Sequence, residues 1–171
     1  TYAAGRATEA EVIREMSERD GLTLVRNRRS LDRELNAWCS QGEPFAVALF
    51  DLDRFKQVND TYGHAVGDEV LKGFAGLLAE ETRGQDVVAR YGGEEFCILL
   101  RGCSLADGVA RAEAVRRAVA SRTWPGPGRM TVSCGVAAYP GDGRKPEELL
   151  SAADSRLYRA KEGGRDRVVS C

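Results

Sequence analysis

The sequence predicts an α+β domain in which helices flank a central, mostly antiparallel sheet, with the ferredoxin-like element order β-α-β-β-α-β from residue 45 onward. Two observations predict this fold. The run FAVALFDLD (45–53) is almost wholly apolar until its end, which is typical of a strand buried on both faces. Farther along, DVVARYGGEEFCILLRG (86–102) holds two strands joined by a Gly-Gly-Glu-Glu turn, and segments of helical periodicity precede and follow it.

Two helices are predicted before the sheet. TEAEVIREMSERD (8–20) has few apolar positions, and we expect it to be the tail of a helix that runs in from an upstream domain. RSLDRELNAWCSQG has apolar residues at helical spacing and ends at Gly42, a suitable C-cap. We therefore expect residues 1–19 to be the linker helix of a regulatory segment and residues 20–171 to be the domain itself.

The remaining elements alternate in a regular order after the first strand. Each predicted helix has an apolar stripe, and each predicted strand is a short apolar run. They are the helix GDEVLKGFAGLLAEETRG (67–84), the two hairpin strands, the helix SLADGVARAEAVRRAVASR (104–122), the strand MTVSCGVAAYP (130–140), the helix PEELLSAADSRLYRAKEGGR (146–165) and a short last strand, RVVS (167–170).

The composition fits one globular domain of 171 residues, with 43% hydrophobic and 30% charged residues. A net charge of −1 gives no overall attraction to nucleic acid or to an acidic membrane surface. Five cysteines without CxxC spacing argue against a zinc site and a disulfide framework. With no signal peptide or long apolar span, we expect a cytoplasmic location, either free or within a larger, membrane-tethered protein. The chain begins with Thr, so we expect it to be part of a longer protein.

Two apolar runs end in acidic residues, although a charged side chain next to a buried strand is energetically unfavourable. Asp51 and Asp53 end the first strand, and Glu94 and Glu95 occupy the hairpin turn. Because these strands are neighbours in the predicted sheet, Asp51 and the turn can converge. The acids can instead simply solvate strand ends, but two such clusters favour a bound cation, and carboxylate oxygens favour Mg²⁺ or Mn²⁺ over zinc. The spacing thus predicts metal-bound phosphate chemistry.

Basic and amide side chains near these acids can bind a substrate. Lys56 follows the acidic cluster, and Lys161 and Arg165 end the last helix, where cations also complement the helix dipole. Lys56 can equally form a simple ion pair with the nearby aspartates. Asn59 and Asp68 together can recognise a guanine edge; their alternatives are an Asx turn and the N-cap region of the helix that starts near Gly67.

With these residues assembled, the chain resembles the GGDEF family of diguanylate cyclases. RYGGEEF matches the family signature in its Glu variant. DLDRFKQVNDTYGHAVGDEVL, TVSCGVA and AADSRLYRAKEGGR follow in the family's order and spacing, so the resemblance runs from about residue 20 to residue 170. It implies a nucleotidyl-cyclase-like palm that condenses two GTP molecules into cyclic di-GMP and two pyrophosphates.

The resemblance also assigns roles to individual residues. The metal ligands would be the Asp51 carboxylate, the Leu52 carbonyl and the Glu94 carboxylate, with Glu95 sharing a second ion. Glu94 would accept the proton of the attacking 3′-hydroxyl. The substrate-binding residues would be Asn59 and Asp68 for guanine, and Lys56, Lys161 and Arg165 for the phosphates. The glycines Gly92 and Gly93 would allow positive φ and close approach of a nucleotide.

A second site is implied by RGQD, which places Arg83 and Asp86 before the signature, like the family's RxxD inhibitory site for the product. The alternative is an ordinary ion pair within a loop. The two-fold symmetry of the product implies that two such domains meet face to face, driven by an upstream sensory or receiver domain. No nucleic-acid or membrane contact by this domain is implied.

Three departures and two rival functions accompany the resemblance. The family's usual DPLTGLxNRR reads DGLTLVRNRR here, with Gly21 in place of Pro and Leu24 in place of Gly. Asp166 stands where Asn is common, which places a negative charge beside Arg165. One rival is a non-catalytic module that binds GTP or cyclic di-GMP, but such modules typically lose an acid of the signature. The other is a mononucleotide cyclase or polymerase-type palm, which the Asn59/Asp68 spacing and the RxxD position disfavour.

Overall fold

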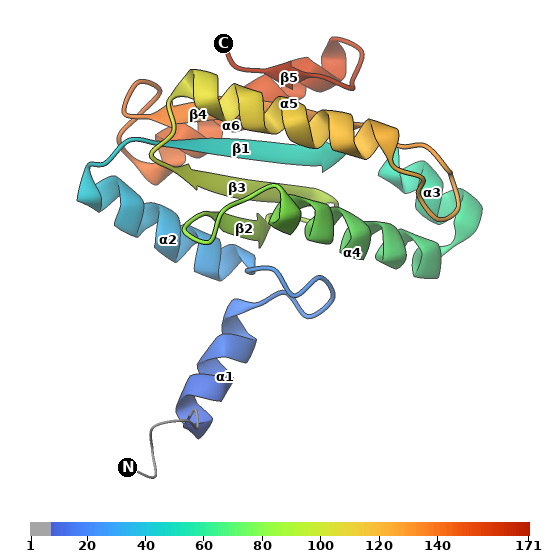
Figure 1. Cartoon of the computed structure of the whole chain (residues 1–171), viewed down its shortest axis with the longest axis horizontal. Helices are drawn as coiled ribbons and strands as arrows, with labels where there is room; N and C mark the ends of the chain where they lie inside the picture. The colour runs from blue at the N-terminus through green and yellow to red at the C-terminus, as the bar shows by residue number, and fades with distance from the viewer. Residues whose placement is uncertain (1–7) are drawn as a thin grey trace.

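A five-stranded sheet with the strand order β2-β3-β1-β4-β5 forms the centre of the molecule (Figure 1). The structure is a computed structural model that describes residues 8–171, apart from the side chains of residues 15 and 16. The helices are α1 (Glu9–Glu18), α2 (Arg28–Gln41), α3 (Phe55–Tyr62), α4 (His64–Glu80), α5 (Leu105–Ser121) and α6 (Pro146–Glu162). The strands are β1 (Phe45–Leu52), β2 (Val87–Arg90), β3 (Glu95–Arg101), β4 (Val132–Tyr139) and β5 (Val168–Val169).

Strand β1 is the central strand, as its apolar sequence predicts. It pairs antiparallel with β3 on one side and with β4 on the other, and all eight of its residues are buried. The predicted α+β fold with a mostly antiparallel sheet is confirmed; only the short β5 runs parallel to its neighbour, β4.

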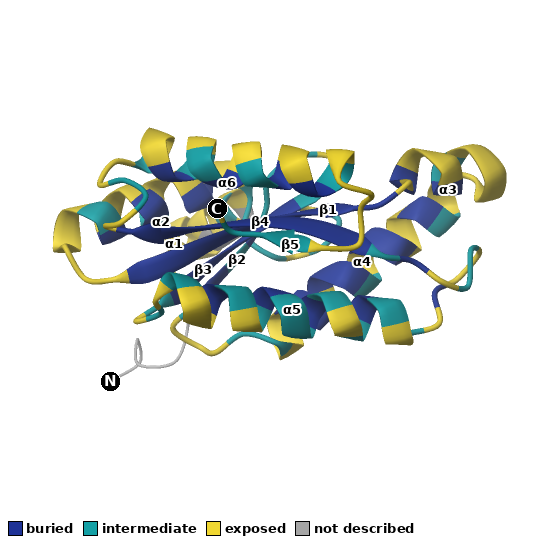
Figure 2. Ribbon diagram, turned by 90° about the horizontal axis from the view of Figure 1, so that it is seen from above, coloured by how far each residue is buried: buried dark blue, intermediate teal, exposed yellow. Residues whose placement is uncertain are grey.

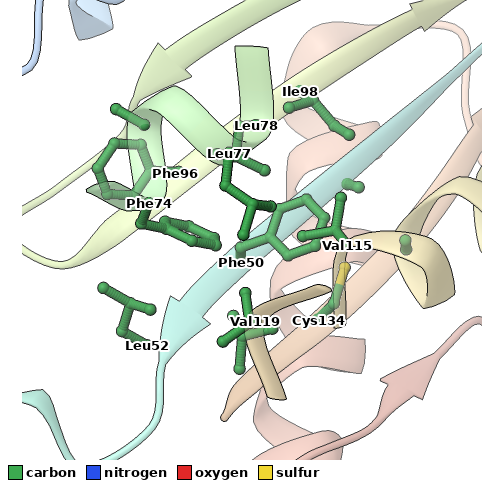
Figure 3. Close-up of a cluster of buried hydrophobic side chains, with 14 of the residues drawn as sticks. Phe50, Leu52, Phe74, Leu77, Leu78, Phe96, Ile98, Val115, Val119 and Cys134 are labelled. Carbon is green, nitrogen blue, oxygen red and sulfur yellow. The ribbon is translucent and has the colours of Figure 1, made fainter. Parts of the chain in front are cut away.

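The two faces of the sheet carry separate helical layers, because alternate residues of β1 point to opposite faces. Helices α2 and α6 cover one face and α4 and α5 the other, as seen in Figure 2. On the α4–α5 side, Phe50 and Phe96 each make an edge-to-face contact with Phe74, at centroid distances of 6.0 and 5.1 Å (Figure 3). Such contacts fix ring orientation as well as burying apolar area.

The segment between β1 and β2 differs from the prediction. A single helix was expected to start near Gly67, but the structure has two helices, α3 and α4, and α4 begins at His64. Gly63 separates them with φ 90°, a conformation that interrupts helical hydrogen bonding. The eight-residue α3 was missed because only Phe55 and Val58 in it are buried, too few to show a helical period.

Helix α6 packs directly against β4 at Gly135. A Cβ atom on Gly135 would lie 2.1 Å from the Ala153 carbonyl oxygen and 2.4 Å from the Leu157 amide nitrogen. No side chain larger than hydrogen fits there unless the helix moves. This contact fixes the height of α6 above the sheet, and hence the position of Lys161 in its last turn.

The junction between α1 and α2 depends on Asn27. Its side chain donates to the Ser17 carbonyl at 2.6 Å and its backbone amide donates to the Glu18 carbonyl at 2.8 Å, so it satisfies the C-terminal end of α1. The same side chain caps α2 by accepting from the Ser30 amide at 2.9 Å. Residues 19–26, here called the lead-in turn, form a loop between the two helices. Figure 1 shows α1 projecting away from the sheet.

The predicted linker helix at residues 1–19 is described only in part, since residues 1–7 lie outside the described residues. Helix α1 starts after a capping box in which Thr8 and Glu11 exchange side-chain and backbone hydrogen bonds. Its apolar residues Val12 and Ile13 are exposed. Among residues 8–171, no helix is both long and apolar enough to cross a membrane.

We expect the ion pair between Asp142 and Arg156 to stabilise the fold at neutral pH and to lose this effect at acidic pH. The guanidinium of Arg156 donates to both carboxylate oxygens, at 2.7 and 2.9 Å, and holds the pKa of Asp142 below its usual value. The stabilisation is present above the ordinary carboxyl pKa and is lost as pH falls through the lowered pKa. Asp142→Asn should cost about 2 kcal/mol at pH 7. Urea unfolding at several pH values should show this cost shrinking from about pH 4 downward; a cost independent of pH would contradict the assignment.

Candidate active site

The acidic end of β1 lies beside the Gly-Gly-Glu-Glu turn. Asp51 is the register partner of Glu95 on β3, so the two side chains project from the same face of the sheet. The backbone amide of Leu52 donates to the carbonyl of Glu94 at 3.4 Å, which joins the turn to the strand end. The sequence-predicted convergence of Asp51 with the turn is therefore present.

An open pocket of about 150 Å³ lies over this junction. It is lined by Asp51 and Leu52 from the end of β1, Asp53 and Arg54 from the turn that follows, Phe55 and Lys56 from the start of α3, Glu94 from the signature turn, and Lys161 and Arg165 from the end of α6 and the loop after it. Three of the predicted metal ligands and all three predicted phosphate-binding cations line this one pocket. Glu95 does not line it, although it lies opposite Asp51.

The Asp51 carboxyl is in an unfavourable place for a negative charge. The residue is 4% exposed, and burial raises its pKa to about 6. A hydrogen bond and the charge of Lys161 act against this rise, while the charges of Glu94 and Glu95 add to it. Asp51 is thus a buried acid that is stabilised by a positive counter-charge.

Lys161 supplies that counter-charge in the described structure. Its ammonium donates to Oδ2 of Asp51 and forms an ion pair with it. The Lys161 side chain is 32% exposed, so it also reaches the open side of the pocket. Lys161 can therefore bind either the carboxylate or an anion in the pocket.

Asp53 has a structural role that differs from the role of Asp51, and the sequence alone does not distinguish the two aspartates. Its buried carboxylate accepts hydrogen bonds from the hydroxyls of Thr131 and Ser133, both at 2.7 Å, and from the backbone amide of Asp166 at 3.0 Å. Both oxygens are engaged by protein donors. Asp53 thereby ties the loop after α6, which carries Arg165, to the end of β1.

Arg165 and Asp166 lie beyond the last helix, because α6 ends at Glu162. The expectation that Arg165 ends the helix is therefore wrong. Both residues have positive φ, 63° and 45°, in a tight loop after Gly164. The Asp166 carboxylate accepts from Arg116 at 3.1 Å, so its charge is partly neutralised by an arginine of α5 instead of acting on Arg165 alone.

The signature turn does not use glycine for left-handed backbone. Neither Gly92 nor Gly93 has a positive φ, contrary to the expectation. The turn is instead closed by the amides of Tyr91 and Gly92, which both donate to the Glu95 carbonyl, at 2.7 and 3.1 Å. A Cβ atom on Gly93 would meet nothing within 4 Å, so this glycine faces open space where a ligand can approach.

Arg90 and Asp20 support the turn and were missed by the sequence analysis. The Arg90 guanidinium donates to the carbonyls of Gly92 and Gly93, the shortest contact being 2.8 Å to Gly93. The same guanidinium forms an ion pair with Asp20 of the lead-in turn at 3.2 Å. The only sequence signal for this support was an arginine two residues before Gly92. Its ion-pair partner, Asp20, is 70 residues away in sequence, so the pair could not be predicted.

Asn59 and Asp68 lie at the junction of α3 and α4, outside the pocket that holds the carboxylates. The Asn59 side chain touches the backbone of Gly67, where a Cβ atom would lie 1.8 Å from its Oδ1. Asp68 follows Gly67 and is exposed in the second turn of α4, so the N-cap alternative for it is wrong. Within residues 8–171, the Asn59 side chain forms no hydrogen bond that would indicate an Asx turn.

Arg83 and Asp86 lie in the turn between α4 and β2. The Asp86 carboxylate accepts from the backbone amides of Arg83 and Arg101, at 2.9 and 3.1 Å. The alternative of an Arg83–Asp86 side-chain ion pair is not found among the described residues, and the Arg83 side chain extends from an exposed residue. Asp86 thus fixes the turn while the Arg83 guanidinium is available to a ligand.

The backbone at Leu24 is left-handed, a conformation that favours glycine, the usual residue here in the family that the chain resembles. Leu24 has φ 65° and is 67% exposed, so its side chain adds left-handed strain and contributes little burial. We expect Leu24→Gly to raise the free energy of unfolding by about 1 kcal/mol. Chemical denaturation measures this gain. Leu24→Ala keeps the Cβ atom and is the matched control; an equal gain in both variants would contradict strain as the cause.

The donor set around Asp51 fits a hard dication. Asp51 and Glu94 offer carboxylate oxygens, Leu52 lines the same pocket, and the buried Asp51 charge requires a positive neighbour. In the described part of the chain, no three acidic, cysteine or histidine side chains already surround a point that a metal could fill. Mg²⁺ usually keeps water and substrate phosphates among its ligands, so two carboxylates and a carbonyl are a sufficient protein contribution.

Comparison with known proteins gives a consistent result. Residues 17–167 match the family model described as "Diguanylate cyclase, GGDEF domain". The response regulator PleD of Caulobacter vibrioides is 41% identical over 164 residues, which cover 91% of this chain and 36% of PleD. The diguanylate cyclase DgcM of Escherichia coli is 38% identical over 164 residues, which cover 94% of this chain and 40% of DgcM. The chain thus spans well under half the length of these relatives.

Solved structures show the same architecture. The coiled coil and GGDEF domain of DgcB from Caulobacter crescentus, in complex with c-di-GMP, superposes with a TM-score of 0.87 at 32% identity and covers 95% of this chain and 90% of that one. The diguanylate cyclase SiaD from Pseudomonas aeruginosa, in complex with its activator SiaC, gives a TM-score of 0.85 at 36% identity and covers 94% and 64% of the two chains.

Proposed function

Because this chain belongs to the GGDEF domain family of diguanylate cyclases, we propose that it condenses two GTP molecules into cyclic di-GMP and two pyrophosphates. The observation that carries the proposal is the pocket that the buried Asp51 and the half-buried Glu94 line together with Lys56, Lys161 and Arg165. A pocket with both carboxylates and cations suits a metal–triphosphate substrate, because the carboxylates can bind the metal and the cations can bind the phosphates.

The pocket residues divide the work of binding by charge. Asp51, Leu52 and Glu94, with Glu95 for a second ion, would hold Mg²⁺ or Mn²⁺. When bound, the metal neutralises triphosphate charge and lowers the pKa of the attacking hydroxyl. Lys56, Lys161 and Arg165 would bind the phosphates and stabilise the charge that develops on the leaving pyrophosphate.

Lys161 would change partner during binding. Its ammonium neutralises Asp51 in the described structure and also borders the open pocket. Once Asp51 has another counter-charge, the Lys161 ammonium can turn to a phosphate without leaving a buried carboxylate unpaired. Glu94, in the turn and next to the pocket, would accept the proton of the 3′-hydroxyl.

Guanine recognition would take place at the junction of α3 and α4, through Asn59 and Asp68. Each domain would hold one GTP, so the two-fold symmetric product requires a second copy that faces the first. Each site would then present its 3′-hydroxyl to the α-phosphate held by the other. The function therefore requires association of two domains as well as a complete pocket.

Regulation would act from both ends of the domain. We propose that Arg83, presented by the turn that Asp86 fixes, binds cyclic di-GMP and lowers activity. We also propose that residues 1–19 are a linker to an upstream sensory or receiver domain, in keeping with relatives that are more than twice as long as this chain. A cytoplasmic location would give such an enzyme access to GTP.

Incubation with GTP and Mg²⁺ tests the proposal. Concentrated protein, or protein dimerised through a coiled coil fused before residue 8, should form cyclic di-GMP detectable by chromatography. EDTA should abolish the product, and Arg117→Ala, which removes an exposed arginine of α5, should not. GTP binding without product at any concentration, even when the protein is dimerised, would identify a receptor module instead of a cyclase.

A further inference from the structure

A further pocket adjoins the active site, between α3 and the loop that joins α5 to β4 (Figure 1). Its volume is about 350 Å³, which lies in the range of small-ligand sites. Asp53 and Arg54 line both this pocket and the pocket over Asp51. We propose that the further pocket, here called the exit pocket, binds pyrophosphate as it leaves the active site. This assignment rests on the proposed cyclase function and adds residues that receive its by-product.

Asp53 stands between the two pockets. Its Oδ2 accepts from the hydroxyl of Thr131, which lines the exit pocket, and from the backbone amide of Asp166, the neighbour of Arg165 in the active-site pocket. The Asp53 amide also donates to the Thr131 carbonyl at 3.0 Å. The two pockets therefore lie on either side of one carboxylate, and Arg54 borders both of them.

The exit pocket has a surplus of positive charge. Among the described residues that line it, Arg54 and Arg129 are basic and Asp53 alone is acidic. Both Asp53 oxygens are already engaged by protein donors. In the part of the chain that the structure describes, neither guanidinium forms an ion pair or a side-chain hydrogen bond. Two such guanidinium groups suit the two phosphoryl groups of pyrophosphate, because each can bind two oxygens of one phosphoryl group.

Arg54 has a backbone conformation that is unusual for its residue type. It precedes α3 with φ 57° and ψ 31°, in the left-handed region, although it is not a glycine. Its side chain is exposed and forms no capping hydrogen bond with the helix. Strained residues of this kind cluster at active sites and ligand clamps. The strain at Arg54 therefore supports a ligand-binding role for its side chain.

The loop that carries Arg129 is held in place by contacts on both sides. Trp124 and Gly128 exchange backbone hydrogen bonds at 2.7 and 3.0 Å, and the Trp124 indole donates to a carbonyl of α5 at 3.0 Å. Gly126 packs closely on α4, since a Cβ atom there would lie 2.7 Å from a methyl group of Val66. A pocket that is formed in advance loses less free energy through ordering when it binds a ligand.

Binding of pyrophosphate in the exit pocket would favour the forward reaction. The reverse reaction needs a pyrophosphate oxygen to attack the phosphorus that has just bonded to the 3′-hydroxyl oxygen. Holding pyrophosphate beyond Asp53 separates it from that phosphorus. It also frees the cations of the active-site pocket for the next triphosphate.

Hydrogen exchange during a titration with pyrophosphate tests the exit pocket, in protein without GTP or divalent metal so that no turnover occurs. Pyrophosphate should slow exchange of the amides in residues 126–131, which lie outside the lining of the active-site pocket. In Arg129→Met, we expect this protection to need about tenfold more pyrophosphate, because a bidentate phosphate contact is lost. Arg129→Lys keeps the charge without the fork and should lie between the two. Arg117→Met removes an exposed cation of α5 and, as the matched control, should behave like the wild type.

Three results would overturn the exit pocket. Protection confined to residues 51–56 and 161–166 would show that pyrophosphate stays in the active-site pocket. Protection of residues 126–131 at the same pyrophosphate concentration in Arg129→Met and the wild type would exclude Arg129 as a ligand. Equal protection by inorganic phosphate would contradict the assignment to pyrophosphate. The cyclase function is judged separately, by formation of cyclic di-GMP from GTP, so its failure and the failure of the exit pocket are distinguishable.

Discussion

Asp51→Asn should abolish cyclase activity and at the same time stabilise the metal-free protein. Under the proposed function Asp51 would hold the metal, so its loss should lower kcat by about 10³-fold or more. The stability gain follows from burial, because the folded protein holds the Asp51 pKa at about 6 instead of its ordinary 3.8. That difference corresponds to about 3 kcal/mol of folding free energy at most. Asp51→Asn also removes the ion-pair partner of Lys161, which offsets part of this. We therefore expect the free energy of unfolding to rise by about 1–3 kcal/mol at pH 7.5.

The pH dependence of this gain has a definite sign. A raised carboxyl pKa favours the folded state at low pH, and the advantage is lost as pH rises through about 6. Wild type and Asp51→Asn should therefore unfold at similar urea concentrations near pH 4 and diverge between about pH 4 and pH 6. Glu94→Gln is the matched control: Glu94 is half-buried in the turn, and its loss should reduce activity without a comparable gain. A destabilised Asp51→Asn would show that the ion pair with Lys161 outweighs the cost of burial.

Asp53→Ala should destabilise the domain strongly, although Asp53 is only two residues from Asp51. The change leaves the Thr131 and Ser133 hydroxyls and the Asp166 amide without their acceptor. We expect a loss of roughly 3–5 kcal/mol, or about 10 °C in melting temperature. GTP should also bind more weakly, because the loop with Arg165 is no longer held at the pocket.

Asp53→Asn distinguishes this explanation from a general intolerance of the site. Its one carbonyl oxygen can still accept, but its amide nitrogen cannot, so it should recover part of the stability lost in Asp53→Ala. Chemical denaturation and the KM for GTP are the two measurements. If Asp53→Ala lost activity with unchanged stability, Asp53 would act on the substrate directly instead of positioning the loop.

The sequence predicts most of the fold because the informative pattern is local. The apolar run of β1, the apolar stripes of α4 and α6 and the Gly-Gly turn each lie within a short window, and the helical and strand periods differ clearly. Helix α3 is the exception, since its burial rests on Phe55 and Val58 alone. The sheet order then follows from the element order, which brings Asp51 next to the turn.

The supporting contacts of the site could not be predicted from spacing. Asp51 and Asp53 look alike in sequence, but the partners of Asp53 are 78, 80 and 113 residues away, around the start of β4 and in the last loop. Arg90 likewise depends on Asp20 at the other end of the domain. Composition shows that these side chains are polar, whereas only tertiary structure shows which of them are already satisfied by protein donors and which are left for a ligand.

Asn27 has a mechanical consequence for the whole domain. The Asn27 side chain caps the C-terminal end of α1 and the N-terminal end of α2, and so links the two helices directly. The lead-in turn forms a loop beside this link. Helix α2 is anchored to the sheet through Leu31, Leu35 and Trp38. These hydrogen bonds therefore connect α1 directly to the helix that is packed on the sheet. In the proposed dimer, rotation of α1 would change how the pocket of one domain faces the pocket of the other.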